Sequence, residues 1–570
     1  MSESESSNPS ARPTLPPAVV RWLPALIFGA ALLLRVWGIS WGLPTAERHW
    51  SYHPDESVVY LYAQQVEPTA LDFDPGFYNY GTLYLTVLRI AGDVAKTYAG
   101  AGDQLWMQMG AGHLAGRWIS ALAGAGTAVV LYFLLRRRFG EFPALFGSLL
   151  IALAPGHVVH SRFQTVDVLA TFLLVLSAHY ALKLLPGLVE EAASGKLAMK
   201  FAALCGLFAG LSAGTKYTGI LALLSLFVVV LFVPKPDRMK LAGVGVGAAI
   251  LVFLLTTPGV FMNSAKFFED FRYEMQHTSQ GHGVVFAGLP SGYAWHFYNL
   301  IIGVGPILLA LGFAGLVFGA IRRDPAALAL GAFFLVYYVL IGRAEVLFLR
   351  YTFPLLLGLG FGLGWLVHWS LSRSKVHRVW PALGILGLGG IVGGGLAGSG
   401  STAVWMAGED PRDQAVTFLR EEAKKNPDTV VGLVSDPWYY TPPFYPESGA
   451  PRGVPFADRN MAMLGASEPR VRRFVPENPD DRFDWDVRLL EEIRPQFVLF
   501  SSFETEGLTR LLSLTGLSEL ERLLTDRLKA FRTKLEADYV PSQAFGGTGW
   551  GIHDMDYIQP RIEIWKRRKP

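Results

Sequence analysis

The sequence predicts a mainly α-helical, polytopic membrane protein with a soluble α/β domain at its C-terminal end. Of its 570 residues, 51% are hydrophobic and only 17% are charged, and the mean hydropathy is +0.31. Long apolar runs fill the first two-thirds of the chain, whereas proline and charged residues return after residue 400. This pattern is typical of a bundle of membrane-spanning helices followed by a domain in water.

Charge and cysteine content exclude several classes of partner and site. A formal net charge of +3 is too small to indicate nucleic acid as a partner. Cys205 is the only cysteine and lies within an apolar run, which excludes an intrachain disulfide and a cysteine-based metal site. We therefore expect the lipid bilayer to be the main surrounding of the chain.

The N-terminal region combines a polar tail with a first span. Residues 1–17 are rich in Ser, Glu and Pro and have no apolar periodicity, which predicts a disordered cytoplasmic tail. Residues 18–39 form a long apolar run without a small-residue cleavage site, so we expect them to stay in the membrane as a signal anchor.

Basic residues in short loops set the sidedness of the other spans, because such residues accumulate in the cytoplasm. The basic clusters are Arg136–Arg138, Lys196 with Lys200, Lys235 with Arg238 and Lys240, Arg322–Arg323, and Arg373 with Lys375 and Arg378. Placing all of them in the cytoplasm predicts about eleven spans of roughly 20 residues in a membrane domain of residues 18–398. After the first, these spans lie near 114–135, 142–158, 168–186, 199–213, 218–233, 240–260, 298–320, 326–342, 351–371 and 379–398.

All of the basic clusters face the cytoplasm only if residues 40–113 form one long outer loop. The apolar stretch 80–95 would then lie along the membrane interface, interrupted by Arg89 and Asp93. If 80–95 spans the membrane instead, every later segment is inverted and the arginines at 136–138 face outside, against the positive-inside rule. A second large outer loop is expected at 261–297.

Residues 405–570 contain no apolar run of spanning length and are predicted to form the soluble α/β domain on the outer side. We expect an amphipathic helix at 411–425, a strand at 429–434, a helix–strand pair at 485–501 and a charged helix at 517–537.

The segment His53-Pro54-Asp55-Glu56 follows the first span and places two acids beside a proline. On a helix, neighbouring residues diverge by about 100°, so Asp55 and Glu56 cannot both face one small site. Pro54 favours a helix start, and acids are stabilised in a first helical turn, so a purely structural cap is the plain interpretation.

Three further polar elements are predicted on the same outer side. His160 to Asp167 ends with an acid at the start of an apolar run, and Gly214 to Gly219 is a tight turn that holds Lys216. Lys216 is not part of a nucleotide P-loop, since the glycine spacing and the preceding strand are absent. A lysine here either snorkels to the interface or binds an anionic partner.

The last of these elements contains Arg350 and Tyr351, near the start of a late span. The two side chains form either an interfacial anchor pair or a lipid-phosphate site, because Arg matches phosphate oxygens in a bidentate way. Glu274, His277 and His282 in the 261–297 loop are weak candidates for metal ligands, since their spacing matches no strong ligand pattern. No cofactor is therefore certain, and a divalent metal remains an open alternative.

Taken in order, these elements resemble the C-type glycosyltransferase (GT-C) superfamily, in the branch of protein mannosyltransferases and the bacterial aminoarabinose transferase of lipid A. The matching segments are His53–Glu56, Gly116–Ser120 with Arg117, Arg162–Asp167, Gly214–Lys216 and Arg350–Pro354. One departure is Tyr78–Gly81, which lacks the lysine found at the corresponding place in aminoarabinose transferases. This difference argues against that particular substrate.

The resemblance implies an enzyme that transfers a sugar from a polyprenyl-phosphate donor, with inversion at the sugar carbon, on the non-cytoplasmic face of the membrane. It implies Asp55 as general base, Asp167 as the acid that positions the acceptor or shares its proton, and Glu56 as a weaker acid. Lys216, Arg350 and Tyr351 would bind the donor phosphate. A protein hydroxyl, a glycolipid and a cell-wall glycan all remain open as acceptors.

Two other classes of protein stay as alternatives. A lipid-linked-sugar flippase or other transporter would also expose anion sites, although we find no internal repeat of the kind that transporters show. A membrane-anchored binding protein would explain the C-terminal domain but not the polar loops. The low cysteine content and the Gly/Ala-rich spans favour the envelope of a bacterium, at its inner membrane.

Overall fold

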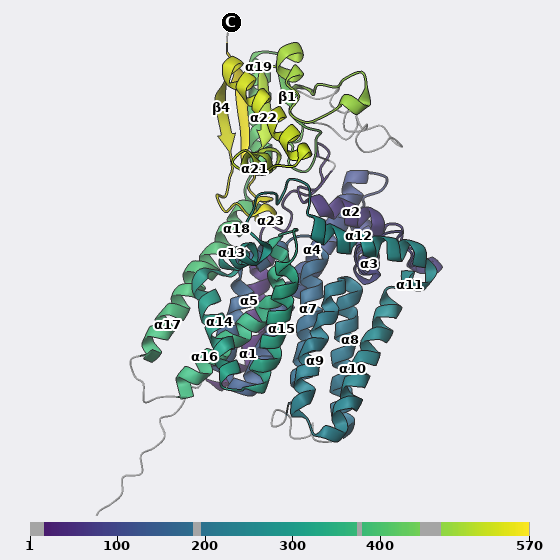
Figure 1. The fold of residues 1–570 in the computed structure, drawn as a ribbon, viewed down its shortest axis with the longest axis vertical. Coiled ribbons are helices and arrows are strands. Elements are labelled where there is room, and N and C mark those ends of the chain that lie inside the picture. Colours follow the sequence, from purple (N-terminus) through teal and green to yellow (C-terminus); the bar gives the residue numbers. More distant parts are fainter. Residues whose placement is uncertain (1–15, 49, 186–194, 373–378, 445–468, 569–570) are drawn as a thin grey trace, which may run out of the picture.

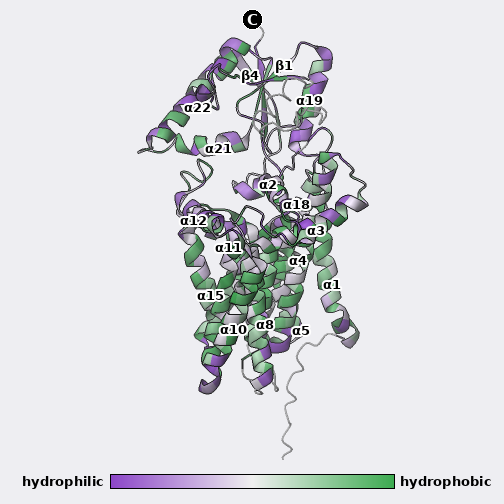
Figure 2. Ribbon diagram, turned by 90° about the vertical axis from the view of Figure 1, so that its right-hand side faces the viewer, coloured by the Kyte–Doolittle hydropathy of each residue, from purple (hydrophilic) through white to green (hydrophobic). Residues whose placement is uncertain are grey.

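The computed structural model describes residues 16–48, 50–185, 195–372, 379–444 and 469–568 (Figure 1). Except for its last two residues, the predicted disordered tail 1–17 lies outside this part of the chain. The described helices form a long bundle below a domain that contains a β-sheet. Figure 2 shows that the bundle is mainly hydrophobic along its length, whereas the sheet domain and the rim between the two parts are richer in hydrophilic residues.

Within the described residues, the bundle and its rim contain eighteen α-helices. They are α1 (Pro17–Val36), α2 (Pro54–Ala63), α3 (Thr82–Tyr98), α4 (Leu105–Phe139), α5 (Glu141–Leu153), α6 (Pro155–His160), α7 (Val166–Leu182), α8 (Gly195–Thr215), α9 (Leu223–Val229), α10 (Lys235–Thr256), α11 (Gly259–Met262), α12 (Ser264–Gln280), α13 (Gly292–Val304), α14 (Pro306–Ile321), α15 (Pro325–Gly342), α16 (Leu356–Ser372), α17 (Val379–Gly389) and α18 (Gly398–Ala407). Short 3-10 segments, η3 (Tyr217–Ala222) and η5 (Leu349–Leu355), precede α9 and α16.

Within the described residues, six helices are long and apolar enough to cross a membrane, and one bent pair raises the number to seven. The six are α1, α4, α8, α10, α15 and the continuous segment Leu349–Ser372. The expected number of about eleven is therefore not confirmed. Several predicted spans are shorter or broken, because Pro155 follows the end of α5 and Gly305-Pro306 bends the chain by 112° between α13 and α14.

The predicted outer segments gather at the end of the bundle nearest the sheet. Helices α2 and α3 from the 40–113 segment and α12 from the 261–297 segment lie there together (Figure 1). α3, which covers most of the ambiguous stretch 80–95, is not among the span candidates of the described chain. Its place on the rim agrees with the interfacial interpretation of this stretch.

Glycines allow α14 and α16 to pack backbone to backbone. A Cβ atom on Gly315 would overlap the carbonyl oxygen of Gly362, and one on Gly362 would overlap that of Gly312. Small residues at helix contacts are the usual means of close packing in membranes, where water supplies no hydrophobic driving force between helices.

The C-terminal part is a five-stranded mixed sheet with helices on both faces. Its strands are β1 (Val430–Leu433), β2 (Arg470–Arg472), β3 (Phe497–Ser501), β4 (Tyr539–Phe545) and β5 (Ile562–Arg567), in the order β2-β1-β3-β5-β4. β2, β1 and β3 are parallel, whereas β5 is antiparallel to both β3 and β4. The helices are α19 (Pro411–Lys425), α21 (Ser502–Leu511), α22 (Glu519–Asp538) and the short α23 (His553–Asp556).

Side chains along β3 point alternately to the two faces of the sheet, and each face has its own apolar cluster. Phe497 and Leu499 belong to the apolar cluster on the α19 side, whereas Val498 and Phe500 belong to the cluster on the α21–α22 side. The predicted helix at 411–425 coincides with α19, and the predicted strand at 429–434 contains β1. The sequence did not indicate β2, β4, β5 or α21, and the boundaries at 398 and 405 remain a prediction.

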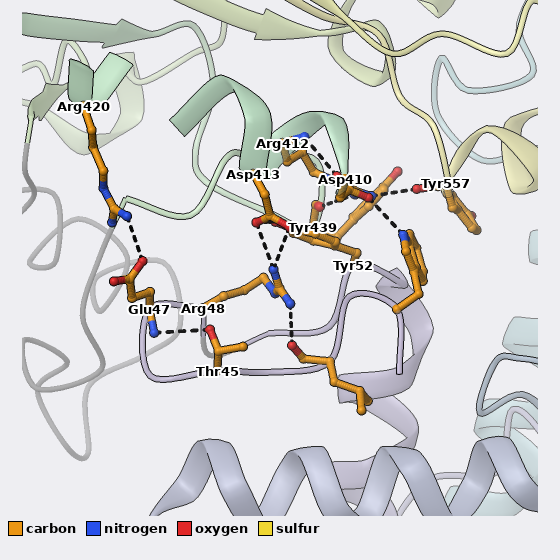
Figure 3. A network of polar contacts seen from close by, with 12 residues as sticks. Thr45, Glu47, Arg48, Tyr52, Asp410, Arg412, Asp413, Arg420, Tyr439 and Tyr557 are labelled. Atoms are coloured by element: carbon orange, nitrogen blue, oxygen red, sulfur yellow. Dashed lines mark hydrogen bonds and ion pairs between the residues drawn. The ribbon is translucent and has the colours of Figure 1, made fainter. Parts of the chain in front are cut away.

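A network of polar contacts joins the sheet domain to the segment after the first helix (Figure 3). Arg412 is fully buried, forms an ion pair with Asp410 at 2.7 Å and stacks on the ring of Tyr52. Tyr52 donates from its hydroxyl to Asp413 at 2.6 Å, and Arg48 forms an ion pair with Asp413 at 3.1 Å. These contacts fix the sheet domain on the rim of the bundle.

We expect Gly315→Ala to lower the free energy of unfolding by about 1–3 kcal/mol, because α14 and α16 must separate to admit the new methyl group. Gly331→Ala is the matched control, since a Cβ at Gly331 of α15 meets no heavy atom within 4 Å. Thermal unfolding of the two purified variants in detergent measures the difference. Equal stability of both variants would contradict close packing of α14 on α16.

Candidate active site

The four polar elements expected on one side of the membrane meet at the rim of the bundle. Asp55 lies in the first turn of α2, Asp167 in the first turn of α7, Lys216 between α8 and η3, and Arg350 in η5. Each therefore stands at the end of a helix or in a tight 3-10 segment. Irregular backbone of this kind is found at membrane proteins' cavities and is rare on their lipid-facing surface.

Arg350 is the centre of the cluster. Its Nη2 donates to Asp55 Oδ2 at 3.1 Å, and its Nε lies 3.7 Å from Asp167 Oδ2. Its Nη1 lies 3.7 Å from Asp554 Oδ2 but makes no hydrogen bond within the described residues. The guanidinium also stacks on the ring of Phe348, with 3.7 Å between Cζ and the ring centroid. One cation thus faces three carboxylates, and its buried Nη1 donates no hydrogen bond to the described residues.

Lys216 supplies the second cation of the site. Its Nζ is 2.6 Å from Asp167 Oδ1 and 4.3 Å from the centroid of the Tyr351 ring. Asp167 therefore lies between Lys216 and Arg350 and holds both at one place. The predicted phosphate-binding residues Lys216, Arg350 and Tyr351 are brought together.

Asp55 is reachable from outside the protein, with 34% of its side chain exposed. Its backbone N–H donates to Nδ1 of His53, which caps α2. Burial raises the pKa of the Asp55 carboxyl, Arg350 opposes this rise, and the nearby carboxylates of Asp167 and Asp554 add to it. The net pKa lies above its ordinary value, which suits a group that must accept a proton.

Glu56 points in a different direction, as the angle between neighbouring helical residues requires. Its side chain is fully buried and forms an ion pair with Arg117 at 2.7 Å. It also accepts hydrogen bonds from the Ser51 hydroxyl and from the backbone N–H of Gln164. Burial favours the protonated form, but Arg117 outweighs this effect and lowers the pKa of Glu56 to about 2. Its geometry is that of a structural tie between α2, α4 and the 160–167 element.

A cavity of about 470 Å³ opens beside Lys216 and Tyr351. Its lining includes Lys216 and Tyr351 at the polar end, together with Tyr80 and Glu274. Most of the remaining surface is apolar and comes from η3, α12 and α15, with Ile220, Leu221, Phe271, Leu340 and Ile341 among the lining residues. The cavity therefore joins an apolar wall to a positively charged end.

The weak metal candidates do not converge on one point. His282 Nδ1 lies 3.2 Å from His277 Nε2, whereas the Glu274 carboxylate lies 3.5 Å from the Asn79 amide and lines the cavity. Among the residues that the structure describes, no group of three or more His, Cys, Asp or Glu is arranged to hold a metal ion.

Asp554 is the site residue that the sequence did not indicate. It lies in α23 of the C-terminal part, 1% exposed, and its two carboxylate oxygens accept hydrogen bonds from the backbone N–H groups of Leu349 and Arg350. No motif surrounds it apart from a glycine-rich run before it. Its place depends on how the C-terminal part docks on the bundle, and local sequence carries little of that information.

Comparison with known proteins shows which family and which folds this chain resembles. Residues 104–261 match the family described as dolichyl-phosphate-mannose-protein mannosyltransferase. Among solved structures, apo ArnT from Cupriavidus metallidurans is 16% identical with a TM-score of 0.50, over 96% of this chain and 98% of ArnT. The Archaeoglobus fulgidus oligosaccharyltransferase in complex with Zn and sulfate is 15% identical with a TM-score of 0.51, over 92% of this chain and 72% of that one. No curated protein matches by sequence search.

Residues 104–261 thus resemble a mannosyltransferase family, and the fold of the chain is similar to the folds of ArnT and the oligosaccharyltransferase. These findings confirm the resemblance that the ordered motifs indicated. They also agree with the mostly helical fold and its several membrane spans. The family match covers α4 to α10 and includes Asp167 and Lys216 but not Asp55 or Arg350.

We expect Glu56→Gln to destabilise the fold by about 3–5 kcal/mol at pH 7, because it leaves Arg117 buried without its partner anion. The pKa of Glu56 is lowered on folding, so the stabilisation is present above its unfolded value and is lost as the pH falls towards about 2. Thermal unfolding is the measurement, with Asp55→Asn in the same helical turn as control. A Glu56→Gln protein of native stability that has lost activity would contradict the structural role.

Proposed function

We propose that this protein transfers a sugar from a polyprenyl-phosphate donor to an acceptor hydroxyl, with inversion at the anomeric carbon. The observation that carries the proposal is a largely apolar cavity with Lys216 at one end, beside a charged cluster in which Asp167 joins Lys216 to Arg350 and Arg350 pairs with Asp55. A lipid-linked sugar phosphate needs the same three features: an apolar slot, a cationic end and a base.

The donor would lie with its isoprenoid chain against the apolar wall and its phosphate at Lys216 and Arg350. The phosphate oxygens would compete with the carboxylates of Asp55 and Asp167 for the same N–H groups. The buried Nη1 of Arg350 makes no hydrogen bond among the described residues, so it can donate to the phosphate once the phosphate has displaced the neighbouring carboxylates. As the phosphate takes over Arg350, Asp55 loses its ion pair and becomes free to act on the acceptor.

The chemistry then needs one base and one stabilised leaving group. The acceptor hydroxyl oxygen attacks the anomeric carbon from the face opposite the phosphate, and Asp55 takes the hydroxyl proton. The bond between the anomeric carbon and the phosphate oxygen breaks, and its electron pair leaves with the polyprenyl phosphate. Lys216 and Arg350 stabilise the charge that develops on that oxygen, and Asp167 keeps both cations in place.

The proposed setting is a bacterial inner membrane with the site on its extracytoplasmic face. Arg138 lies near the C-terminal end of α4, far along this helix from the site, and its ion pair with Asp324 at 2.8 Å joins two segments expected in the cytoplasm. Helix α7 has 17 residues and reaches about 26 Å, close to the thickness of the hydrocarbon core. We propose that α7, like the other short apolar segments, crosses the membrane.

We propose three classes of acceptor: protein side chains, glycolipids and cell-wall glycans. The Archaeoglobus fulgidus oligosaccharyltransferase has been solved with a tethered acceptor peptide, with a TM-score of 0.50 to this chain, 14% identity, and coverage of 93% of this chain and 73% of that one. A protein side chain is therefore one of the acceptors to be tried, beside glycolipids and cell-wall glycans. The absence of a lysine in Tyr78–Gly81 argues against aminoarabinose as the sugar.

We expect Asp55→Asn to lower the transfer rate by roughly 100-fold or more while the protein stays folded, because the amide cannot take the acceptor proton. The assay measures labelled sugar transferred from a polyprenyl-phosphate donor, with Asp103→Asn on the exposed outer segment as control. In the wild type, the rate should fall with falling pH through a midpoint above the ordinary pKa of Asp, since only ionised Asp55 is a base. Full transfer by Asp55→Asn would refute its assignment as the base.

A further inference from the structure

We infer that Asp554, from the C-terminal part of the chain, is a positioning residue that holds Arg350 in place for the donor phosphate. This inference rests on the proposed function and extends it, because the active site is then completed by a segment that comes from the C-terminal part of the chain and packs against the bundle. Nothing in the family match covers this position, which lies far from residues 104–261.

The contacts of Asp554 are directed at the start of the segment that carries Arg350. One carboxylate oxygen accepts from the Leu349 N–H at 2.9 Å and the other from the Arg350 N–H at 3.1 Å. The second oxygen also lies 3.3 Å from Nε2 of His160 and 3.7 Å from Nη1 of Arg350. Asp554 therefore binds both the backbone and the charged end of the same residue.

The segment around Asp554 is anchored firmly enough to act in this way. Ile552, Met555 and Tyr557 are at most 1% exposed and belong to the main apolar core of the membrane bundle, not to the clusters around the sheet. Arg412 donates to the Tyr557 carbonyl at 2.7 Å and thereby ties this segment to the docking network of Figure 3. Burying a carboxylate costs free energy unless it has polar partners. The Asp554 carboxylate has four, namely the N–H groups of Leu349 and Arg350, the His160 ring and the Arg350 guanidinium.

The negative charge of Asp554 also offsets the electrostatic attraction of Arg350 towards Asp55 and Asp167. Without its charge, the nearest carboxylates to the guanidinium are Asp55 at 3.1 Å and Asp167 at 3.7 Å, both on the side of the proposed base. The guanidinium would move towards them, and an incoming phosphate would have to break a tighter ion pair. Donor binding should weaken for this reason, whereas acceptor binding should not.

A merely structural role is the competing explanation, because Asp554 satisfies two free N–H groups at the start of a 3-10 segment. Asn at this position keeps one acceptor oxygen and the shape of the side chain but removes the charge. Asp556→Asn is the matched control. Asp556 is buried in the same short helix, contacts Thr548 instead of Arg350, and has its pKa raised by burial to about 7, so that an amide resembles its protonated form.

The first experiment compares steady-state kinetics of wild type, Asp554→Asn and Asp556→Asn with a polyprenyl-phosphate sugar donor. We expect Asp554→Asn to raise the KM for the donor by about tenfold and to leave the KM for the acceptor unchanged, with Asp556→Asn close to wild type. Equal changes in both KM values, or the same loss in Asp556→Asn, would overturn the inference.

The second experiment measures binding of undecaprenyl phosphate to wild type, Asp554→Asn, Arg350→Gln and the double variant. If Asp554 acts through Arg350, Asp554→Asn weakens binding in the wild type and adds nothing in the Arg350→Gln background; independent, additive effects would overturn the inference. A wild type that binds undecaprenyl phosphate but transfers no sugar refutes the proposed function alone. A wild type that does not bind it refutes both.

Discussion

The site depends on one buried arginine that is shared by three carboxylates. Asp55, Asp167 and Asp554 come from segments separated by more than a hundred residues, and each reaches Arg350 from a different element. A buried cation is stable only when charged partners replace its water, so the arrangement of helices around the rim must bring these acids together. The same requirement leaves the cation available to an anionic ligand that can displace a carboxylate.

The places where helices start, end or change to 3-10 form bring the acids together around Arg350 as much as the long helices do. Long helices such as α4 give the bundle its length, and glycines between α14 and α16 make it tight. The site residues lie where helices start or change form: at the first turns of α2 and α7, at the turn before η3, and in η5. Helix ends expose free backbone groups and concentrate charge at the rim, which suits a reaction at the membrane surface.

Much of the site was predictable because charged side chains have a high free-energy cost in or beside a membrane and are therefore rare there. Asp55, Asp167, Lys216 and Arg350 each stand out against an apolar background, and a common sidedness was enough to group them. The helix start at Pro54 and the divergence of Asp55 from Glu56 follow from local geometry alone. The deep burial of Glu56 against Arg117 does not, because it depends on where α4 passes.

What the sequence could not predict depends on contacts between distant segments. Hydropathy alone does not register a bend such as that at Gly305-Pro306 or the end of α5 before Pro155, so the predicted number of spans is not confirmed by helix length. Asp554 was missed because its neighbours in the sequence belong to the C-terminal part, whereas its contacts belong to the bundle. Strands β2, β4 and β5 are short or lie at the end of the chain, and their pairing is set by the sheet rather than by their own residues.

The most direct test of the account follows a doubly labelled polyprenyl-phosphate sugar with the purified protein in sealed lipid vesicles. The account predicts that the sugar label moves to the acceptor while free polyprenyl phosphate accumulates in equal amount, from donor on one face of the membrane. Movement of the intact donor between leaflets, with sugar and lipid still joined and no product formed, would contradict the account and indicate a transporter instead.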